Sequence, residues 1–176
     1  MSSGKNRGRI MVIVYQSNTG FTQEYAQMLG KAEKMKVYAL DQDQPTKGEK
    51  VLFLGPLMAG HISGLDEANK RFSLQAVCGV GMSPPGQDVM NRMRRANYLS
   101  DLPLFYLQGG WAPKKVGWLK RRMVNMVTRP ARKALLAKGT RTPQEQEQLD
   151  FLVRGGSYVA YQNLDEVRAW LKNQPR

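Results

Sequence analysis

Five short strand-like segments that alternate with helical patterns are the feature that most constrains the fold of this chain. The segments are Ile10–Tyr15, Lys36–Leu40, Val51–Leu54, Leu74–Val80 and Pro103–Leu107. Helical spacing of apolar residues lies between them, at 22–34, 65–72 and 86–97. Continuous apolar runs are typical of strands buried on both faces of a parallel sheet. The alternation therefore predicts an α/β fold with a doubly wound, five-stranded parallel sheet and right-handed crossovers.

The alternation of strands and helices stops after Gln108. An apolar stripe with cations on the opposite side predicts a helix there, which Pro130 should end or kink. A capping box at 142–145 predicts another helix that runs to Arg154. The stripe consists of Val116, Leu119, Met123, Met126 and Val127. We interpret residues from about 109 to 156 as a helical insertion late in the chain.

The two ends of the chain complete the predicted organisation. After the insertion we expect a short strand at Tyr158–Tyr161 and a last helix, capped by 163–166, that continues the sheet domain. Residues 1–8 are rich in Gly, Ser, Lys and Arg, as in a flexible leader or an expression remnant. The folded domain is therefore expected to span residues 9–176.

The net charge of +13 comes almost entirely from one block of the chain. Residues 92–141 contain 13 Lys and Arg and one acid, Asp101, which leaves 14 cations and 13 acids elsewhere. Such a block indicates a surface that seeks anions. A hydrophobic fraction of 41% excludes a disordered tail protein. No apolar run reaches the length of a membrane span, and the first residues lack the apolar core of a signal peptide, so a cytoplasmic protein is expected.

Few residues could support metal or thiol chemistry. His61 is the only histidine and Cys78 the only cysteine, so neither a zinc site nor an internal disulfide is expected. Cys78 lies within an apolar strand and is predicted to be a core residue.

The strongest candidate site is the segment between the first strand and the first helix. In open parallel sheets, ligands bind at the carboxyl ends of the strands. Three of the six residues carry hydroxyls, and the following helix offers free amide groups to an anion. No lysine or arginine is present, so the segment differs from a Walker loop and suits a small terminal phosphate; alternatively, it only caps the helix. The six residues are Ser17, Asn18, Thr19, Gly20, Phe21 and Thr22.

This segment resembles the phosphate-binding loop of the flavodoxin family, Thr/Ser-x-Thr-Gly-x-Thr, at Ser17, Thr19, Gly20 and Thr22. The resemblance implies that the loop binds the phosphate of FMN. It also implies that the flavin ring lies between two further loops, Gly55–His61 and Gly81–Gly86. The residues implicated there are Pro56, Leu57, Met58, Ala59, Gly60, Gly81, Met82, Ser83, Pro84 and Gly86. Carrier flavodoxins typically have aromatic residues in these two loops and a strongly acidic chain. This chain has neither feature, which disfavours a diffusing electron carrier.

A closer resemblance is to the menaquinone-dependent protoporphyrinogen IX oxidases, which are flavodoxin-like enzymes with a basic helical insertion. It rests on the Gly60–His61 pair and on the basic stretch 114–123. It implies an FMN-dependent oxidoreductase of heme biosynthesis that passes electrons from a porphyrinogen through the flavin to a quinone. His61 would donate a proton to the flavin or substrate, or be a structural hydrogen bonder. The alternatives are a soluble flavodoxin-type carrier or quinone reductase, and a flavin-free module that binds membrane or nucleic acid.

The cations of the insertion allow several functions. Together with two tryptophans, they fit a helix that lies on the anionic inner face of the membrane, where a quinone could be reached. They could also bind the propionates of a porphyrinogen, bind the backbone of a nucleic acid, or form a solvated face while the apolar stripe packs on the domain. The residues implicated in binding substrate or membrane are Trp111, Lys114, Lys115, Trp118, Lys120, Arg121 and Arg122.

Overall fold

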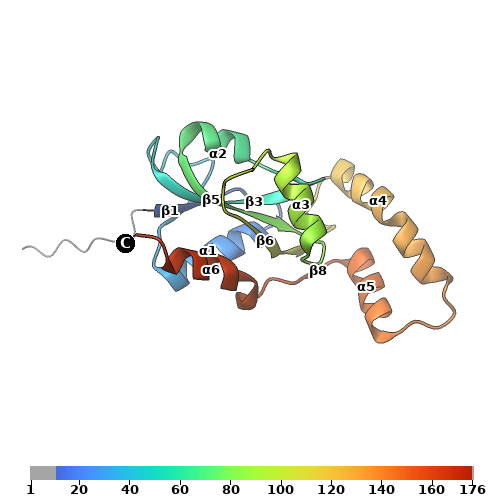
Figure 1. The fold of residues 1–176 in the computed structure, drawn as a ribbon. Helices are drawn as coiled ribbons and strands as arrows, with labels where there is room; N and C mark the ends of the chain where they lie inside the picture. Colours follow the sequence, from blue (N-terminus) through green and yellow to red (C-terminus); the bar gives the residue numbers. More distant parts are fainter. Residues whose placement is uncertain (1–10, 176) are drawn as a thin grey trace, which may run out of the picture. The chain divides into compact units, whose positions relative to one another are not determined.

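The computed structural model describes residues 11–175, which divide into two compact units. The first unit contains residues up to 109 and those from 159, and the second contains residues 110–158. The first unit is built on a parallel sheet in the order β2-β1-β3-β5-β6, with the short strand β4 antiparallel to β3 (Figure 1). The strands are β1 (Met11–Tyr15), β2 (Val37–Ala39), β3 (Lys50–Met58), β4 (His61–Ile62), β5 (Ser73–Gly81) and β6 (Leu104–Gln108).

The five parallel strands confirm the predicted mixed α/β fold with a parallel sheet. One boundary is wrong: β3 does not end at Leu54 but continues to Met58. The extension forms because Leu57 and Met58 pair with Ile62 and His61 in an antiparallel hairpin that the sequence pattern did not indicate. The predicted leader 1–8 and the first strand residue, Ile10, lie outside the described residues.

Helices cover both faces of this sheet (Figure 1). Adjacent residues of one strand point to opposite faces, so Ile13 packs under one pair of helices and Val14 under the other. The same holds for Leu52 and Phe53. Because both faces of these strands are buried, their sequences are continuous apolar runs. One face is covered by α1 (Phe21–Glu33) and α6 (Asp165–Lys172), the other by α2 (Leu65–Arg71) and α3 (Gln87–Ala96).

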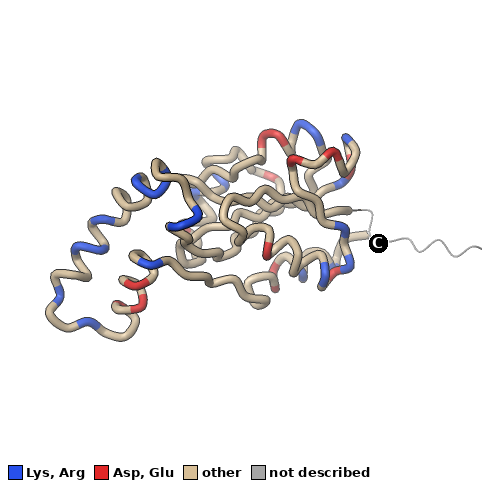
Figure 2. The backbone as a smooth tube through the Cα atoms, turned by 180° about the vertical axis from the view of Figure 1, so that it is seen from behind, with Lys and Arg blue, Asp and Glu red and all other residues tan. Residues whose placement is uncertain are grey.

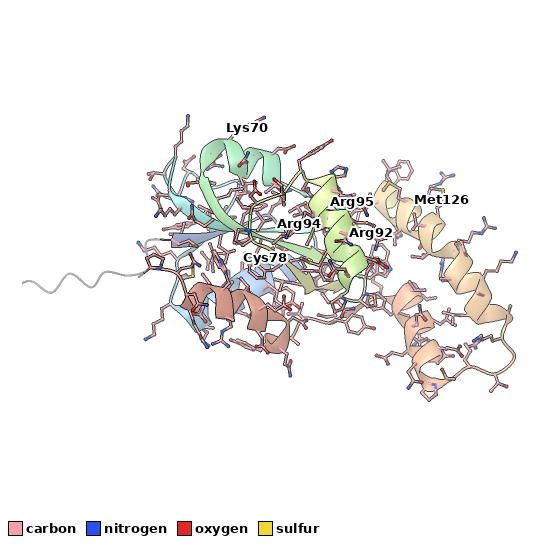
Figure 3. The ribbon with its side chains drawn as sticks, in the orientation of Figure 1. Lys70, Cys78, Arg92, Arg94, Arg95 and Met126 are labelled. Carbon is pink, nitrogen blue, oxygen red and sulfur yellow. The ribbon has the colours of Figure 1, made fainter. Side chains whose placement is uncertain are left out.

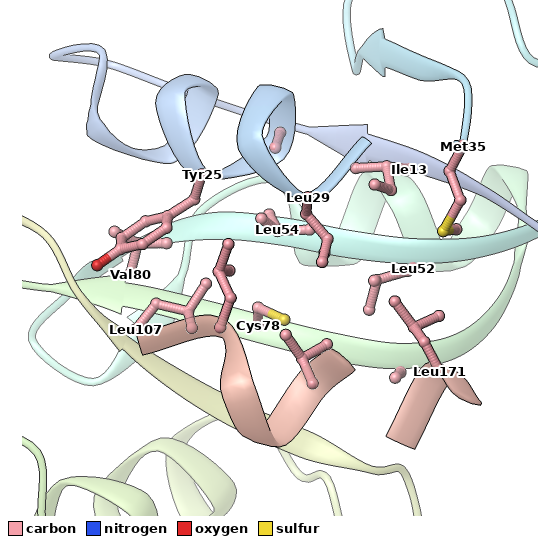
Figure 4. Packing of buried hydrophobic residues seen from close by; sticks show 14 of the residues in the cluster. Ile13, Tyr25, Leu29, Met35, Leu52, Leu54, Cys78, Val80, Leu107 and Leu171 are labelled. Atoms are coloured by element: carbon pink, nitrogen blue, oxygen red, sulfur yellow. The ribbon is translucent and has the colours of Figure 1, made fainter. Parts of the chain in front are cut away.

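Cys78 is fully buried in the core between the sheet and helices α1 and α6, as predicted (Figure 4). Burial raises the pKa of its thiol, because a thiolate would lose its hydration there. Cys78 is therefore an unreactive core side chain.

A buried tyrosine joins the two points at which the chain leaves and re-enters the first unit. The Tyr25 hydroxyl donates to the carbonyl of Gln108 at 2.5 Å and accepts from Asn163 Nδ2 at 2.6 Å. Asn163 Nδ2 also lies 3.4 Å from the Gln108 carbonyl. Gln108 is the last residue of β6 and Asn163 lies in a short 3-10 helix, η1 (Tyr161–Leu164). This hydrogen-bonded triad joins the end of β6 to η1 within the first unit, although residues 110–158 separate them in sequence.

The predicted last helix is present as α6, but two details predicted for residues 158–166 are wrong. Tyr158–Tyr161 is not a strand, since the only strand residues nearby are those of β8 (Gly156–Ser157) and η1 begins at Tyr161. Asn163 does not cap the last helix either, because its side chain is bonded to Tyr25 and Gln108; α6 has no side-chain cap.

The second unit consists of two helices that lie, in sequence, between the two strands of a small antiparallel pair. β7 (Gly110–Trp111) pairs with β8, and α4 (Trp118–Ala137) packs on α5 (Pro143–Arg154). The predicted capping box of α5 is present, with Glu145 N–H donating to Thr142 Oγ1 at 3.2 Å. Pro130 does not end α4. It lies on an exposed part of the helix, where water can bond the Met126 carbonyl that loses its helical partner.

We predict that Tyr25→Phe lowers the free energy of unfolding by about 1–3 kcal/mol, because the half-buried Gln108 carbonyl and Asn163 amide each lose their hydrogen bond to the phenol. Urea unfolding of the purified protein measures this change. Tyr38→Phe is the matched control, since Tyr38 packs against the core under helices α2 and α3 and its hydroxyl has no hydrogen bond within the described residues. Equal stability of the two variants would show that the triad contributes nothing.

Candidate functional site

The predicted site segments lie at one edge of the sheet. Strands β1, β3 and β5 run parallel, so the segments that follow them emerge at the same edge, at their carboxyl ends. The segment after β1 is the hydroxyl-rich loop, the one after β3 is the hairpin turn, and the one after β5 is the loop 82–86. The topology therefore places the three segments that the sequence implicated at the same edge of the sheet.

The loop after β1 leaves the amino end of α1 open. Ser17 Oγ accepts a hydrogen bond from the Gly20 N–H at 3.1 Å, which closes the loop on itself. Gly20 is the N-cap, with a φ of 101°, and no side chain caps the first turn of α1. No side chain of the loop accepts a hydrogen bond from the first turn of α1, although Ser17 holds the N-cap residue. The first amides of α1, without a side-chain acceptor, can bind an external anion.

The other residues of this loop differ in accessibility. Thr19 is half-buried and Asn18 is exposed, whereas Thr22, inside the first turn of α1, is only 2% exposed. Phe21 packs against the core. Ser17 and Thr19 are thus the hydroxyls best placed to reach a ligand at the surface.

The segment Gly55–His61 is not a loop but the end of β3 and a two-residue hairpin turn. Ala59 and Gly60 both have positive φ, of 50° and 87°, as a type I′ turn requires. Asn97, just after α3, holds this turn: its Nδ2 donates to the Gly60 carbonyl and its Oδ1 accepts from the Ile62 N–H, both at 2.8 Å. Sequence reasoning missed Asn97, because its role depends on a contact across 37 residues. His61 pairs with Met58 in the hairpin and is exposed.

The loop after β5 is held by a tyrosine of the neighbouring strand. Tyr106 Oη donates to the Ser83 carbonyl at 2.5 Å, and burial raises the pKa of Tyr106. A Cβ at Gly81 would lie 2.9 Å from the Tyr106 hydroxyl, so Gly81 provides the space that this contact needs. Met82, Ser83, Pro84 and Gly86 remain loop residues, as predicted. Tyr106 supplies an aromatic ring near a site whose predicted loops contain none.

Two cavities of the first unit lie next to these loops. A cavity of about 460 Å³ is lined by Ser17 and Asn18 together with Asp41 after β2. Another, of about 340 Å³, is lined by Gly86, Tyr106 and Gln108. Both volumes lie within the range of small-molecule sites. Neither cavity includes residues of the β3–β4 hairpin.

No group of three or more His, Cys, Asp or Glu side chains that could hold a metal ion occurs among residues 11–175. The acidic neighbours of the first cavity, Asp41 and Glu67, are a pair only. Within the same residues, no helix has both the length and the apolar character needed to cross a membrane.

The predicted cations of the insertion lie on and before α4 (Figure 2). Lys114, Lys115, Arg121 and Arg122 are exposed, while Lys120 is half-buried and burial lowers the pKa of its ammonium group. Trp118 is exposed but Trp111 is buried, so Trp118 alone of the two can touch a surface.

The apolar stripe of α4 is exposed rather than packed on α5. Met126, for example, is 67% exposed and points away from α5 (Figure 3). The exposed members are Leu119, Met123, Met126 and Val127, whereas Val116, which precedes the helix, is buried. Helix α4 therefore presents an apolar strip beside a row of cations.

We predict that Gly20→Ala lowers the free energy of unfolding by about 1–2 kcal/mol through backbone strain, since a φ of 101° disfavours any side chain. Gly86→Ala is a matched control. Both glycines are helix N-caps with open space around a Cβ, but Gly86 has an extended φ of 168°. Thermal or urea unfolding compares the two variants, and equal losses would contradict strain at Gly20.

Comparisons with protein-family models, with characterised proteins and with solved structures find no match for this chain. Its function is therefore inferred from its own residues and their arrangement.

Proposed function

We propose that this protein is an FMN-dependent oxidoreductase of the protoporphyrinogen-oxidase type that works at an anionic membrane surface. The observation that carries the proposal is the loop Ser17–Thr22, which leads into an uncapped helix at the carboxyl edge of a parallel sheet. The strand order β2-β1-β3-β5-β6 is the order of flavodoxin-like folds, once β4 is set aside. We accordingly assign the first unit to that fold.

The donors of this loop suit the phosphate of FMN. Ser17 Oγ accepts from Gly20, so its own hydrogen remains free to donate, and Thr19 adds a second hydroxyl. The amides and positive dipole end of α1 favour an anion without a cationic side chain. Gly86 has open space on its Cβ side, so the loop after β5 adds no side-chain bulk at that point.

Bound FMN would supply hydride and electron transfer. The residues of the chain would hold and orient it: Ser17 and Thr19 at the phosphate, and the hairpin turn, fixed by Asn97, beside the ring. Tyr106 would fix the loop 82–86 through its hydrogen bond to the Ser83 carbonyl. His61 is exposed on the hairpin and could deliver a proton to a substrate at this edge.

The exposed strip of α4 supports work at a membrane rather than in free diffusion. An apolar strip flanked by cations is the pattern of helices that lie in the headgroup region of a bilayer. Arg122 and Arg129 lie on one side of the strip by helical spacing, and α4 has no acidic residue. Such a position would let the enzyme pass electrons to a quinone dissolved in the membrane.

We predict that Ser17→Ala and Thr19→Ala each weaken FMN binding about tenfold or more, because hydrogen bonds to charged groups contribute about 1.5–3 kcal/mol. Riboflavin, which lacks the phosphate, should bind all variants equally. Quenching of flavin fluorescence on titration measures both affinities. Ser73→Ala, at the opposite end of β5, is the control.

Failure of the wild-type protein to bind FMN would exclude every flavin-dependent function and leave a membrane- or nucleic-acid-binding module. If FMN binds, reduction by protoporphyrinogen followed by reoxidation with a menaquinone analogue supports the oxidase. Reduction only by a protein partner would instead indicate an electron carrier.

We predict that Met126→Ser weakens binding to anionic liposomes about tenfold, because burial of a methionine side chain contributes about 1.5–3 kcal/mol. Leu136→Ser is the matched control, since Leu136 is similarly exposed on α4 but lies off the strip by helical spacing. Liposome co-sedimentation measures the binding, and FMN affinity should not change. Equal effects of the two variants would remove the strip as the membrane contact.

A further inference from the structure

The second unit contains a cavity of about 530 Å³ between α4 and α5 whose charged lining is entirely cationic. The cations are Lys114, Arg121, Arg132 and Arg154. Trp111 and Leu152 belong to its apolar walls. The volume is that of a site for a small organic molecule.

No ion pair with another described residue neutralises these four cations. The ion pair within this unit joins Lys138 to Glu145, away from the cavity lining. Positive charges that surround one cavity repel each other, and the repulsion strengthens where water is displaced. The carboxyl end of α5, which includes Arg154, contributes only partial negative charge. The cavity is thus a positive site without an internal counter-ion.

Arg132 adds a second, independent observation. One terminal nitrogen, Nη2, donates to the Asn125 carbonyl at 2.9 Å, but Nε is buried and has no hydrogen-bond partner among the described residues. Because Nε is closed to solvent, the nitrogen available to a ligand in the cavity is the other terminal one, Nη1, which has no hydrogen bond among the described residues. Guanidinium groups bind carboxylates and phosphates with two parallel hydrogen bonds, so this arrangement fits such a ligand.

The cavity is distinct from the exposed strip of α4. Its α4 residues, Arg121, Asn125 and Arg132, lie on the side of the helix toward α5, whereas Met126 points away from α5 (Figure 3). By helical spacing the two sets are on opposite sides of α4. A ligand in the cavity therefore does not compete with a surface that contacts the strip.

We propose that this cavity binds an organic oxyanion, a carboxylate or phosphate, carried on an apolar body. Arg121 and Arg132 bind the oxyanion, while Trp111 and Leu152 contact the apolar body. The proposal does not depend on flavin binding, and the first unit contributes no residue to the site.

The test uses the full chain without added FMN and the fluorescent probe 1-pyrenebutyrate, with neutral 1-pyrenebutanol as its matched control. Pyrenebutyrate should bind at least tenfold more tightly than the alcohol. Arg132→Gln should weaken pyrenebutyrate binding at least tenfold, whereas Arg129→Gln, an exposed α4 cation outside the cavity, should change it less than twofold. Displacement by octanoate or by octyl phosphate distinguishes a carboxylate ligand from a phosphate ligand.

A double variant, Lys114→Gln with Arg154→Gln, guards against misfolding caused by loss of Arg132. Neither side chain makes a hydrogen bond or ion pair within the described residues, so helix content by circular dichroism should not change, while probe affinity should fall at least tenfold. Equal binding of the two probes, equal effects of Arg132→Gln and Arg129→Gln, unchanged affinity in the double variant, or failure of both octyl anions to displace the probe would each overturn the proposal.

Discussion

The first unit depends on the hydrogen bonds of one buried phenol. Tyr25 is fully buried, so its hydroxyl must find partners inside the protein, and it finds Gln108 and Asn163. These two residues lie at the exit and the return of the chain around residues 110–158. Because Gln108 and Asn163 both bond this buried hydroxyl, the triad favours one closed arrangement of β6, η1 and α1. The sheet can thereby accept a long insertion while β6 and α6 stay in register with the rest of the domain.

The positive charge of the chain serves more than one surface. The block 92–141 reads as a single basic segment, yet helical geometry separates its cations on α4 into different sides. Arg121 and Arg132 line the cavity toward α5, whereas Arg122 and Arg129 flank the apolar strip. The excess of cations along the sequence therefore predicts binding of anions. The number of separate binding surfaces follows only from the positions of these cations around the α4 axis.

The parts of the fold that could be predicted are those set by local pattern. Strands such as Val51–Leu54 are apolar on both faces because both faces are covered, and the box at Thr142 and Glu145 is complete within four residues. The missed features depend on distant partners: Asn97 reaches the Gly60 turn, and Asn163 reaches Tyr25. For the site, the loop at Ser17 could be predicted from its hydroxyls and its position after the first strand. The role of Tyr106 could not be predicted, because it depends on a hydrogen bond to Ser83, which is distant in sequence.

The two proposed anion sites solve the same physical problem in different ways. At Ser17–Thr22 the amino end of α1 directs its free amides and positive dipole end toward the ligand, so a small phosphate can be bound by neutral donors. The cavity of the second unit has the opposite helix end, since it is lined by the last residues of α5, whose carbonyls repel anions. Binding an oxyanion there requires full positive charges, which explains why four cationic side chains gather at one site and none at the other.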